Sequence, residues 1–172
     1  MTTVPAATTA PPAPTDRRWV AFLRGADATG TLTALAGVFS TRGVSFDSLA
    51  TGHAVDGEGL IVVTFSATQR RQRLLVRTVR RLAVVRAVQV RAADDPEVRA
   101  AAVVHLPASS GGFVPPGGTA VRWSGDPAAG QPVLVEGGLP DVERVVADAR
   151  ARGAVSAATV VLPLPDPEPA RP

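Results

Sequence analysis

The sequence contains no cysteine and no lysine among its 172 residues. Without cysteine there is no disulfide, no thiolate nucleophile and no cysteine-based metal site. All 18 basic residues are arginine, which, together with abundant Ala, Val, Gly and Pro, indicates a coding bias and warns against giving every arginine a role. The formal net charge of +3 is too small to argue for nucleic acid by itself.

Long hydrophobic runs are also missing. The longest apolar runs fall far short of the ~20 residues that a membrane-spanning helix needs, so no membrane partner is expected. Residues 1–17 have no charged start followed by an apolar segment and therefore do not predict a secretory signal. Their Pro, Ala and Thr content predicts a disordered tail, as does the composition of residues 165–172. The expected location is cytoplasmic.

The hydrophobic fraction of 45% is enough for a core, and the length predicts one domain or two small ones. The first compact unit is expected over residues 18–93. Its predicted elements, in chain order, are a strand at 19–25, a helix at 29–43, strands at 44–52 and 60–67, a helix at 68–83 and a strand at 84–92. This order predicts a ferredoxin-like α+β fold, βαββαβ, with both helices on one face of an antiparallel sheet. The other face, or an unpaired edge strand, is expected to be covered by a second copy of the chain.

The predicted helix at 29–43 has the clearest start and stop signals of the chain. Asp27 or Thr29 is positioned to cap its start, and Gly43 lies where helices commonly end in a left-handed residue. The residues expected to form its buried apolar stripe are Leu32, Leu35, Ala36 and Phe39. The following strand is expected to alternate between two faces, with Val44, Phe46 and Ser48 on one of them.

The second unit is expected over residues 94–164. Strands are predicted around 101–106, at 119–125, at 131–138 and at 154–164, with a Gly/Pro loop at 109–118. A helix is predicted at 139–153, ending at Gly153 and burying Val142, Val145, Val146 and Ala149. The unit is therefore a degenerate ferredoxin-like α+β domain in which a loop replaces the first helix. Trp123 is expected to be a packing residue.

No catalytic constellation is recognisable, so the sequence does not predict an enzyme. His53 and His105 are far apart and have no carboxylate at ligand spacing, which argues against a metal site. Arginines fill the segment from Arg70 to Arg81, and no acidic residue occurs between Glu58 and Asp94. This segment is either a solvated helix face, a surface for an acidic partner or a nucleic-acid patch. With 4% aromatics, an RNA-binding sheet is disfavoured.

Residues 30–52, GTLTALAGVFSTRGVSFDSLATG, resemble the ACT domain of the small regulatory subunit of acetolactate synthase (acetohydroxyacid synthase). The positions in step with that family are Gly30, Leu32, Gly37, Phe39, Arg42, Gly43, Ser48, Leu49 and Gly52. Residues 94–107 and 132–164 are similar to parts of the family's second domain. The chain departs from the family at Asp27, Thr29 and Ser45, where the family has Asn, Pro and Asn.

The resemblance implies a non-catalytic regulatory subunit that forms a homodimer through its ACT domains. Its implied partner is the large catalytic subunit of acetolactate synthase, which carries thiamine diphosphate and condenses pyruvate toward valine, leucine and isoleucine; this chain would hold no cofactor. The implied effector is an amino acid such as valine, held where two ACT domains meet. The effector-binding residues implied are Asp27, Thr29, Gly30, Thr31, Leu32 and Ser45.

Elementary chemistry supports that site independently of the resemblance. The first amides of a helix favour a carboxylate, and Gly30 allows close approach. Asp27 can accept from an ammonium group, and Ser45 can add a hydrogen bond from the same or the partner chain. Three alternatives stay open: an ordinary well-capped helix without a ligand, a stand-alone ACT-type amino-acid sensor that serves another protein, and an RNA-binding ferredoxin-like module.

Overall fold

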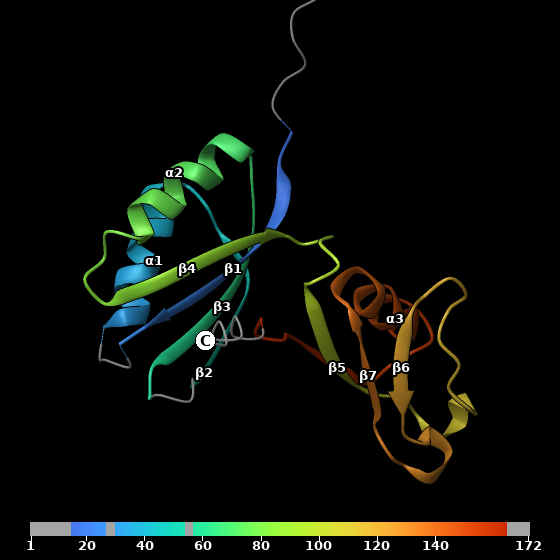
Figure 1. Cartoon of the computed structure of the whole chain (residues 1–172). Coiled ribbons are helices and arrows are strands. Elements are labelled where there is room, and N and C mark those ends of the chain that lie inside the picture. The colour runs from blue at the N-terminus through green and yellow to red at the C-terminus, as the bar shows by residue number, and fades with distance from the viewer. Residues whose placement is uncertain (1–14, 27–29, 54–56, 165–172) are drawn as a thin grey trace, which may run out of the picture.

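The computed structural model describes residues 15–26, 30–53 and 57–164, which form two units, each built on a four-stranded antiparallel sheet (Figure 1). The first unit contains β1 (Arg17–Gly25), α1 (Thr31–Thr41), β2 (Phe46–His53), β3 (Gly59–Ala67), α2 (Gln69–Val79) and β4 (Val85–Ala92). Its strand order is β2-β3-β1-β4. This confirms the predicted ferredoxin-like βαββαβ fold.

The core of the first unit lies between the sheet and its two helices. The buried residues that form it include Ala21, Leu23, Leu35, Phe39, Ile61, Val63, Phe65, Leu75 and Val79. The ring of Phe39 contacts those of Phe46 and Phe65, with centroid separations of 4.5 and 5.3 Å. Aromatic pairs of this kind add about 0.5–1.5 kcal/mol beyond the burial of their area, and here they fix α1 against the sheet.

Helix α1 begins and ends at glycines with positive φ. Gly30 (φ 92°) precedes it and Gly43 (φ 62°) follows it, which confirms the expected role of Gly43. The predicted apolar stripe was wrong in two of its four members, because Leu32 is 45% exposed and Ala36 is also exposed. Ala36 points well away from the buried face at 100° per residue, and Leu32 lies in the first turn, where it borders a cavity.

Strand β2 contains a bulge at Asp47. Phe46 pairs with Phe65, but Ser48 pairs with Thr64, so two steps along β2 match one step along β3. A bulge of this kind shifts the side-chain alternation by one residue. The prediction that Phe46 and Ser48 share a face was therefore wrong.

The second unit repeats the first without its first helix. It contains β5 (Arg99–His105), the 3-10 turn η1 (Ala108–Ser110), β6 (Val121–Ser124), the 3-10 turn η2 (Pro127–Ala129), β7 (Val133–Gly138), α3 (Leu139–Ala151) and β8 (Ser156–Val161). The strand order β6-β7-β5-β8 corresponds strand by strand to the order β2-β3-β1-β4 of the first sheet. The prediction of a degenerate ferredoxin-like domain is confirmed.

Helix α3 buries the four residues predicted for it, Val142, Val145, Val146 and Ala149, and it is followed by Gly153 at φ 89°. Where a first helix would lie, the chain runs through a Gly/Pro loop whose Phe113 is 3% exposed. The ring of Phe113 meets that of Trp123 at a centroid separation of 5.2 Å. A buried aromatic side chain therefore supplies part of the apolar surface that the missing helix would supply.

The outer face of the first sheet is covered by the chain itself. Val20, Phe22 and Val62 on that face are buried in one cluster with Val98 and other core residues of the second unit. The expectation that a second copy covers this face or an edge strand therefore does not hold for the face, and for the edge strand it stays a prediction. Every described helix falls short of the combination of length and hydrophobicity that a bilayer crossing requires.

One ion pair of Arg18, with Glu143, joins the two units, and a second, with Asp47, lies within the first unit. The Arg18 guanidinium lies 2.5 Å from Glu143 of α3 and 3.4 Å from Asp47 of β2. All three side chains are about one-third exposed, so these pairs add orientation more than stability. Next to the Arg18–Glu143 pair, Val20, Phe22 and Val62 of the first unit share one buried apolar cluster with the second unit.

Candidate functional site

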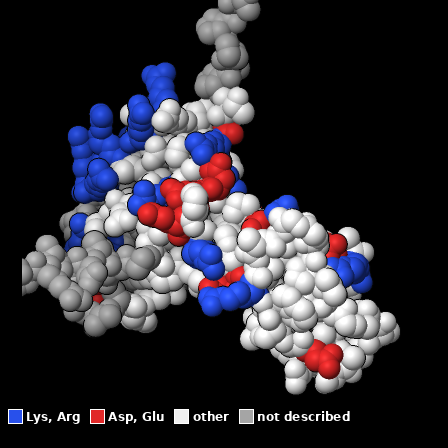
Figure 2. Space-filling model, turned by 45° about the vertical axis from the view of Figure 1, so that its right-hand side comes forward, with Lys and Arg blue, Asp and Glu red and all other residues white. Residues whose placement is uncertain are grey.

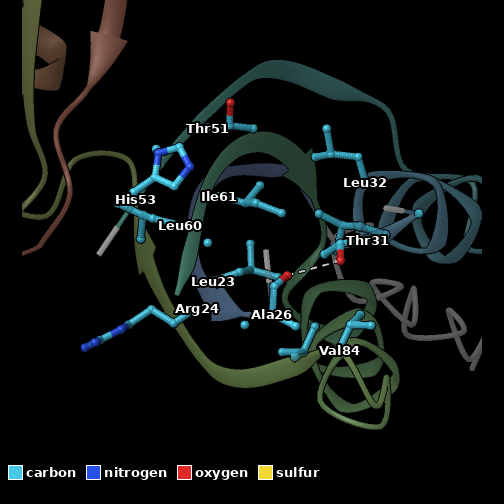
Figure 3. A pocket seen from close by; sticks show the side chains of 16 residues that line it. Leu23, Arg24, Ala26, Thr31, Leu32, Thr51, His53, Leu60, Ile61 and Val84 are labelled. Carbon is cyan, nitrogen blue, oxygen red and sulfur yellow. Dashed lines mark hydrogen bonds between the residues drawn. The ribbon is translucent and has the colours of Figure 1, made fainter. Parts of the chain in front are cut away.

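A cavity of about 350 Å³ lies at the end of the first sheet, next to the start of α1 (Figure 3). Four strands and one helix meet there, because β1 and β2 end, and α1, β3 and β4 begin, at the same end of the unit. Its lining residues are Leu23, Arg24, Gly25, Ala26, Gly30, Thr31, Leu32, Leu35, Thr51, Gly52, His53, Gly59, Leu60, Ile61, Val84 and Val85. This volume is in the range of small-molecule sites.

The polar side of the cavity is made by the backbone at the start of α1. Gly30 is the N-cap residue, no side chain caps the helix, and its first turn carries no acidic residue. The first amides of a helix have no acceptor within the helix and carry a partial positive charge. The Thr31 hydroxyl donates to the Ala26 carbonyl at 3.3 Å, which ties the first turn to the end of β1. This side of the cavity therefore favours an anionic group.

The end of β1 is held by a close approach of two backbones. The Ala26 N–H donates to the Val84 carbonyl at 2.9 Å. A Cβ atom on Gly25 would lie 2.1 Å from the Val84 oxygen, which is far inside van der Waals contact. Only glycine fits at this position, and its absence of a side chain lets Val84 form part of the cavity wall.

The remaining walls are largely apolar. Leu23 and Leu35 are buried at the floor, while Leu60, Ile61 and Val84 supply further aliphatic surface. Figure 3 shows side chains from several elements around one space, with Thr31 and Leu32 on one side and His53 and Leu60 on the other. The site thus combines an anion-favouring backbone with an aliphatic pocket.

The charged group at the rim is already neutralised. The Arg24 side chain extends away from the cavity (Figure 3), and its Nε atom lies 3.3 Å from Glu58. Glu58, only 16% exposed, also lies 2.5 Å from Arg86. A ligand therefore meets a cavity whose charge preference is set by the helix terminus more than by a free side-chain cation.

Three of the predicted effector-binding residues, Gly30, Thr31 and Leu32, line this one cavity. Asp27 and Thr29 lie outside the described residues. Ser45 does not line the cavity: it is exposed and precedes β2, about 26 Å along the strand from the end that does.

Sequence reasoning missed the opposite wall, formed by the end of β2, the start of β3 and Val84-Val85. The predicted topology already contained that signal, because it places these segments at the same end of the sheet as the start of the first helix.

Outside the cavity, the part of the chain that the structure describes holds neither a metal centre nor a hydrolytic triad. It contains no group of three His, Asp or Glu side chains that could hold a metal ion. The His105 Nδ1 lies 3.0 Å from the Ser156 hydroxyl, but both are exposed and no described carboxylate orients the imidazole. A nucleophile and base without that third group do not make a hydrolytic triad.

Comparisons with known proteins find no matching family model and no matching curated protein. Among solved structures, the chain is similar to the acetolactate synthase small subunit from Thermotoga maritima, with a TM-score of 0.62 and 15% identity, over 84% of this chain and 94% of that one. It is also similar to the regulatory subunit of aspartate kinase from Thermus thermophilus, with a TM-score of 0.41 and 16% identity, over 79% of this chain and 90% of that one. The first comparison confirms the resemblance at the level of the fold, over both units.

Proposed function

We propose that this chain is a non-catalytic regulatory subunit that binds an amino-acid effector and controls the thiamine-diphosphate-dependent catalytic subunit of acetolactate synthase. The observation that carries the proposal is the cavity at the start of α1, which joins an anion-favouring backbone to an aliphatic pocket. The two-unit fold, similar over most of its length to an acetolactate synthase small subunit, supports the choice of partner.

The proposed ligand is a small zwitterion with an aliphatic side chain, such as valine, leucine or isoleucine. Its carboxylate accepts from the first amides of α1, at Gly30, Thr31 and Leu32, where the helix dipole favours negative charge. Its side chain packs against the aliphatic wall that includes Leu60 and Ile61. Asp27, which lies outside the described residues, is the proposed acceptor for the ammonium group.

We propose that the site is completed by a second copy of the chain. Strand β2 is at the edge of its sheet, and on this side Leu49 is 41% and Leu32 is 45% exposed. An unpaired edge with exposed apolar residues favours pairing with another strand. Two β2 strands paired antiparallel place the start of one beside the end of the other, which brings Ser45 of the second copy toward Thr51 and His53 of the first.

Regulation requires that the effector bind two arrangements of the complex with different affinities. A coupling free energy of about 1–3 kcal/mol is typical of such systems. Thiamine diphosphate and pyruvate belong to the catalytic subunit in this proposal. The residues of this chain bind the effector and hold the assembly, and they take no part in bond making or breaking.

Calorimetric titration of the full chain with valine, leucine and isoleucine tests the effector. We expect saturable binding of at least one of them, and loss of binding for valinamide, which keeps the side chain but lacks the carboxylate. Equal affinity for valine and valinamide would show that the ligand carboxylate does not bind at the start of α1. Binding of none of the three amino acids would refute the proposed effector class.

The partner is tested separately, by affinity capture from native extract of the source organism. We expect the tagged chain to retain a thiamine-diphosphate enzyme that forms acetolactate, and added chain to change its sensitivity to valine. The Asp27-Ala28-Thr29 sequence, which departs from the family pattern, favours the second candidate, a stand-alone amino-acid sensor. Amino-acid binding without capture of that enzyme would support the sensor instead.

A further inference from the structure

Helix α2 and the turn that follows it carry a group of exposed arginines. Arg70, Arg73 and Arg77 recur every three or four residues and are exposed, so they lie on one face of α2 over about 10 Å, and exposed Arg81 follows in the turn after the helix. Arg71 and Arg80 flank them. We call these six residues the α2 arginine stripe. Figure 2 shows basic side chains gathered over this part of the first unit.

No ion pair joins the stripe to a carboxylate in the part of the chain that the structure describes. None of its six arginines lies within ion-pair distance of a described carboxylate, although Asp16 lines a shallow hollow with Arg70 and Arg71. The described carboxylates that are ion-paired all pair with arginines elsewhere; they are Asp47, Glu58, Asp94, Glu97, Glu136, Asp141, Glu143 and Asp148. Surface charges of both signs are ordinarily interspersed; here one sign is concentrated.

Apolar surface lies within the same stripe. Leu74 is 39% exposed between Arg70 and Arg77, and Val76 lines a groove with Arg73, Arg77, Arg80 and Arg81. The neighbouring contacts hold this region in place, since the Thr68 side chain caps α2 by accepting from the Arg71 N–H at 3.3 Å. Arginine around an exposed aliphatic residue is the composition of protein–protein interfaces.

We propose that the α2 arginine stripe docks an acidic surface of a different protein, with an apolar side chain of that protein over Leu74. A second copy of this chain is a poor occupant, because most of its described carboxylates are already paired. The site goes beyond the proposed effector function, since no stripe residue lines the effector cavity. Charge complementarity supplies orientation and a fast, salt-sensitive association rate.

Nucleic acid is the competing occupant, and the structure disfavours it. RNA-binding ferredoxin-like domains stack bases on aromatic residues of the open sheet face. In this chain that face carries Val20, Phe22 and Val62, and they are buried against the second unit. The stripe itself contains no aromatic side chain on which a base could stack. Contacts there would be to phosphate alone, and Leu74 would have no role in them.

The test uses the full chain and two labelled probes, an acidic peptide of Glu-Glu-Leu repeats and a single-stranded RNA of equal length, followed by fluorescence anisotropy at about 50 and 200 mM salt. We expect the peptide to bind more tightly at low salt. Arg73→Gln/Arg77→Gln/Arg81→Gln should weaken peptide binding by about tenfold or more. Glutamine keeps helix propensity, and far-UV circular dichroism checks the fold.

Two matched variants decide the interpretation. Arg73→Lys/Arg77→Lys/Arg81→Lys keeps the charge and should retain binding within about threefold, while Leu74→Gln should weaken the peptide complex severalfold at both salt concentrations. Peptide binding that no variant alters would overturn the proposal, as would RNA binding tighter than peptide binding and insensitive to Leu74→Gln. The same variants are expected to bind valine with unchanged affinity in calorimetry. A failure of the docking proposal can therefore be told apart from a failure of the proposed effector site.

Discussion

Replacing Gly30 by aspartate places a carboxylate where the ligand carboxylate is proposed to bind. A Cβ atom at Gly30 would meet nothing within 4 Å, so the substitution does not act by a clash. Two like charges about 4–8 Å apart, at an effective dielectric constant of about 20–80, repel by roughly 0.5–4 kcal/mol. A value near the middle, about 2 kcal/mol, lowers affinity about 30-fold. We therefore expect calorimetry to show valine affinity reduced by at least about tenfold.

The backbone adds a second effect, which a control separates. Gly30 has a φ of 92°, and a side chain there costs about 1–2 kcal/mol of folding stability. Gly30→Asn has nearly the same shape as Gly30→Asp and pays a similar cost without the charge. Urea unfolding should give similar losses for the two variants, whereas only aspartate should repel the ligand. An unchanged affinity in Gly30→Asp, or an equal loss in Gly30→Asn, would refute the electrostatic reasoning.

Three further predictions concern the fold, the edge and the pH response. Gly25→Ala should lower the free energy of unfolding in urea by about 3 kcal/mol or more, because its Cβ would lie 2.1 Å from a backbone oxygen. The control is Gly37→Ala in α1, whose Cβ meets nothing within 4 Å and which should raise the free energy of unfolding by about 0.5–1 kcal/mol. Leu49→Lys should shift light scattering from the proposed dimer toward the monomer without loss of circular dichroism, since charge on an edge strand blocks pairing. A dimer that persists in this variant would exclude β2 as the interface. The Arg144 guanidinium lowers the pKa of Asp141 below its ordinary 3.8. The ionised Asp141 carboxylate therefore stabilises the fold above pH 3.8, and this contribution is lost as the pH falls through the lowered pKa. Asp141→Asn should make the free energy of unfolding less dependent on pH in acid, and an unchanged dependence would contradict a stabilising Asp141–Arg144 pair.

Local sequence signals predicted where the helices and strands lie, but not in every case which of their side chains are buried. The stripe of α3 was read correctly because its residues face one continuous sheet. The stripe of α1 was not, because the exposure of Leu32 depends on where the strands beneath it end. The bulge at Asp47 depends on how β2 pairs with β3, which is a non-local property. The buried outer face had a readable signal: β1 is apolar at consecutive positions from Val20 to Leu23, as is typical of a strand covered on both faces.

The candidate site divides in the same way. Its backbone half, at the start of α1, follows from the glycine and the amphipathic pattern around residue 30. Its aliphatic half comes from three other elements that are distant in sequence, and only the strand order brings them together. Residues such as Val84 carry no pattern that marks them as ligand-binding. The place of Val84 in the cavity wall becomes visible only in the structure, where Gly25 admits the Val84 backbone.

The two proposed binding regions share one pair of packed helices. Helix α1 starts at the cavity, and at its other end the Arg42 guanidinium donates to the Thr78 hydroxyl of α2 at 3.0 Å. A ligand that displaced the first turn of α1 would therefore act on α2, next to the arginine stripe, if α1 moved as a rigid body. Any such coupling is reciprocal. If the effector changes the affinity for an acidic partner by a given factor, the partner must change the affinity for the effector by the same factor. The Arg42–Thr78 hydrogen bond is thus one contact through which coupling between the two proposed regions would pass.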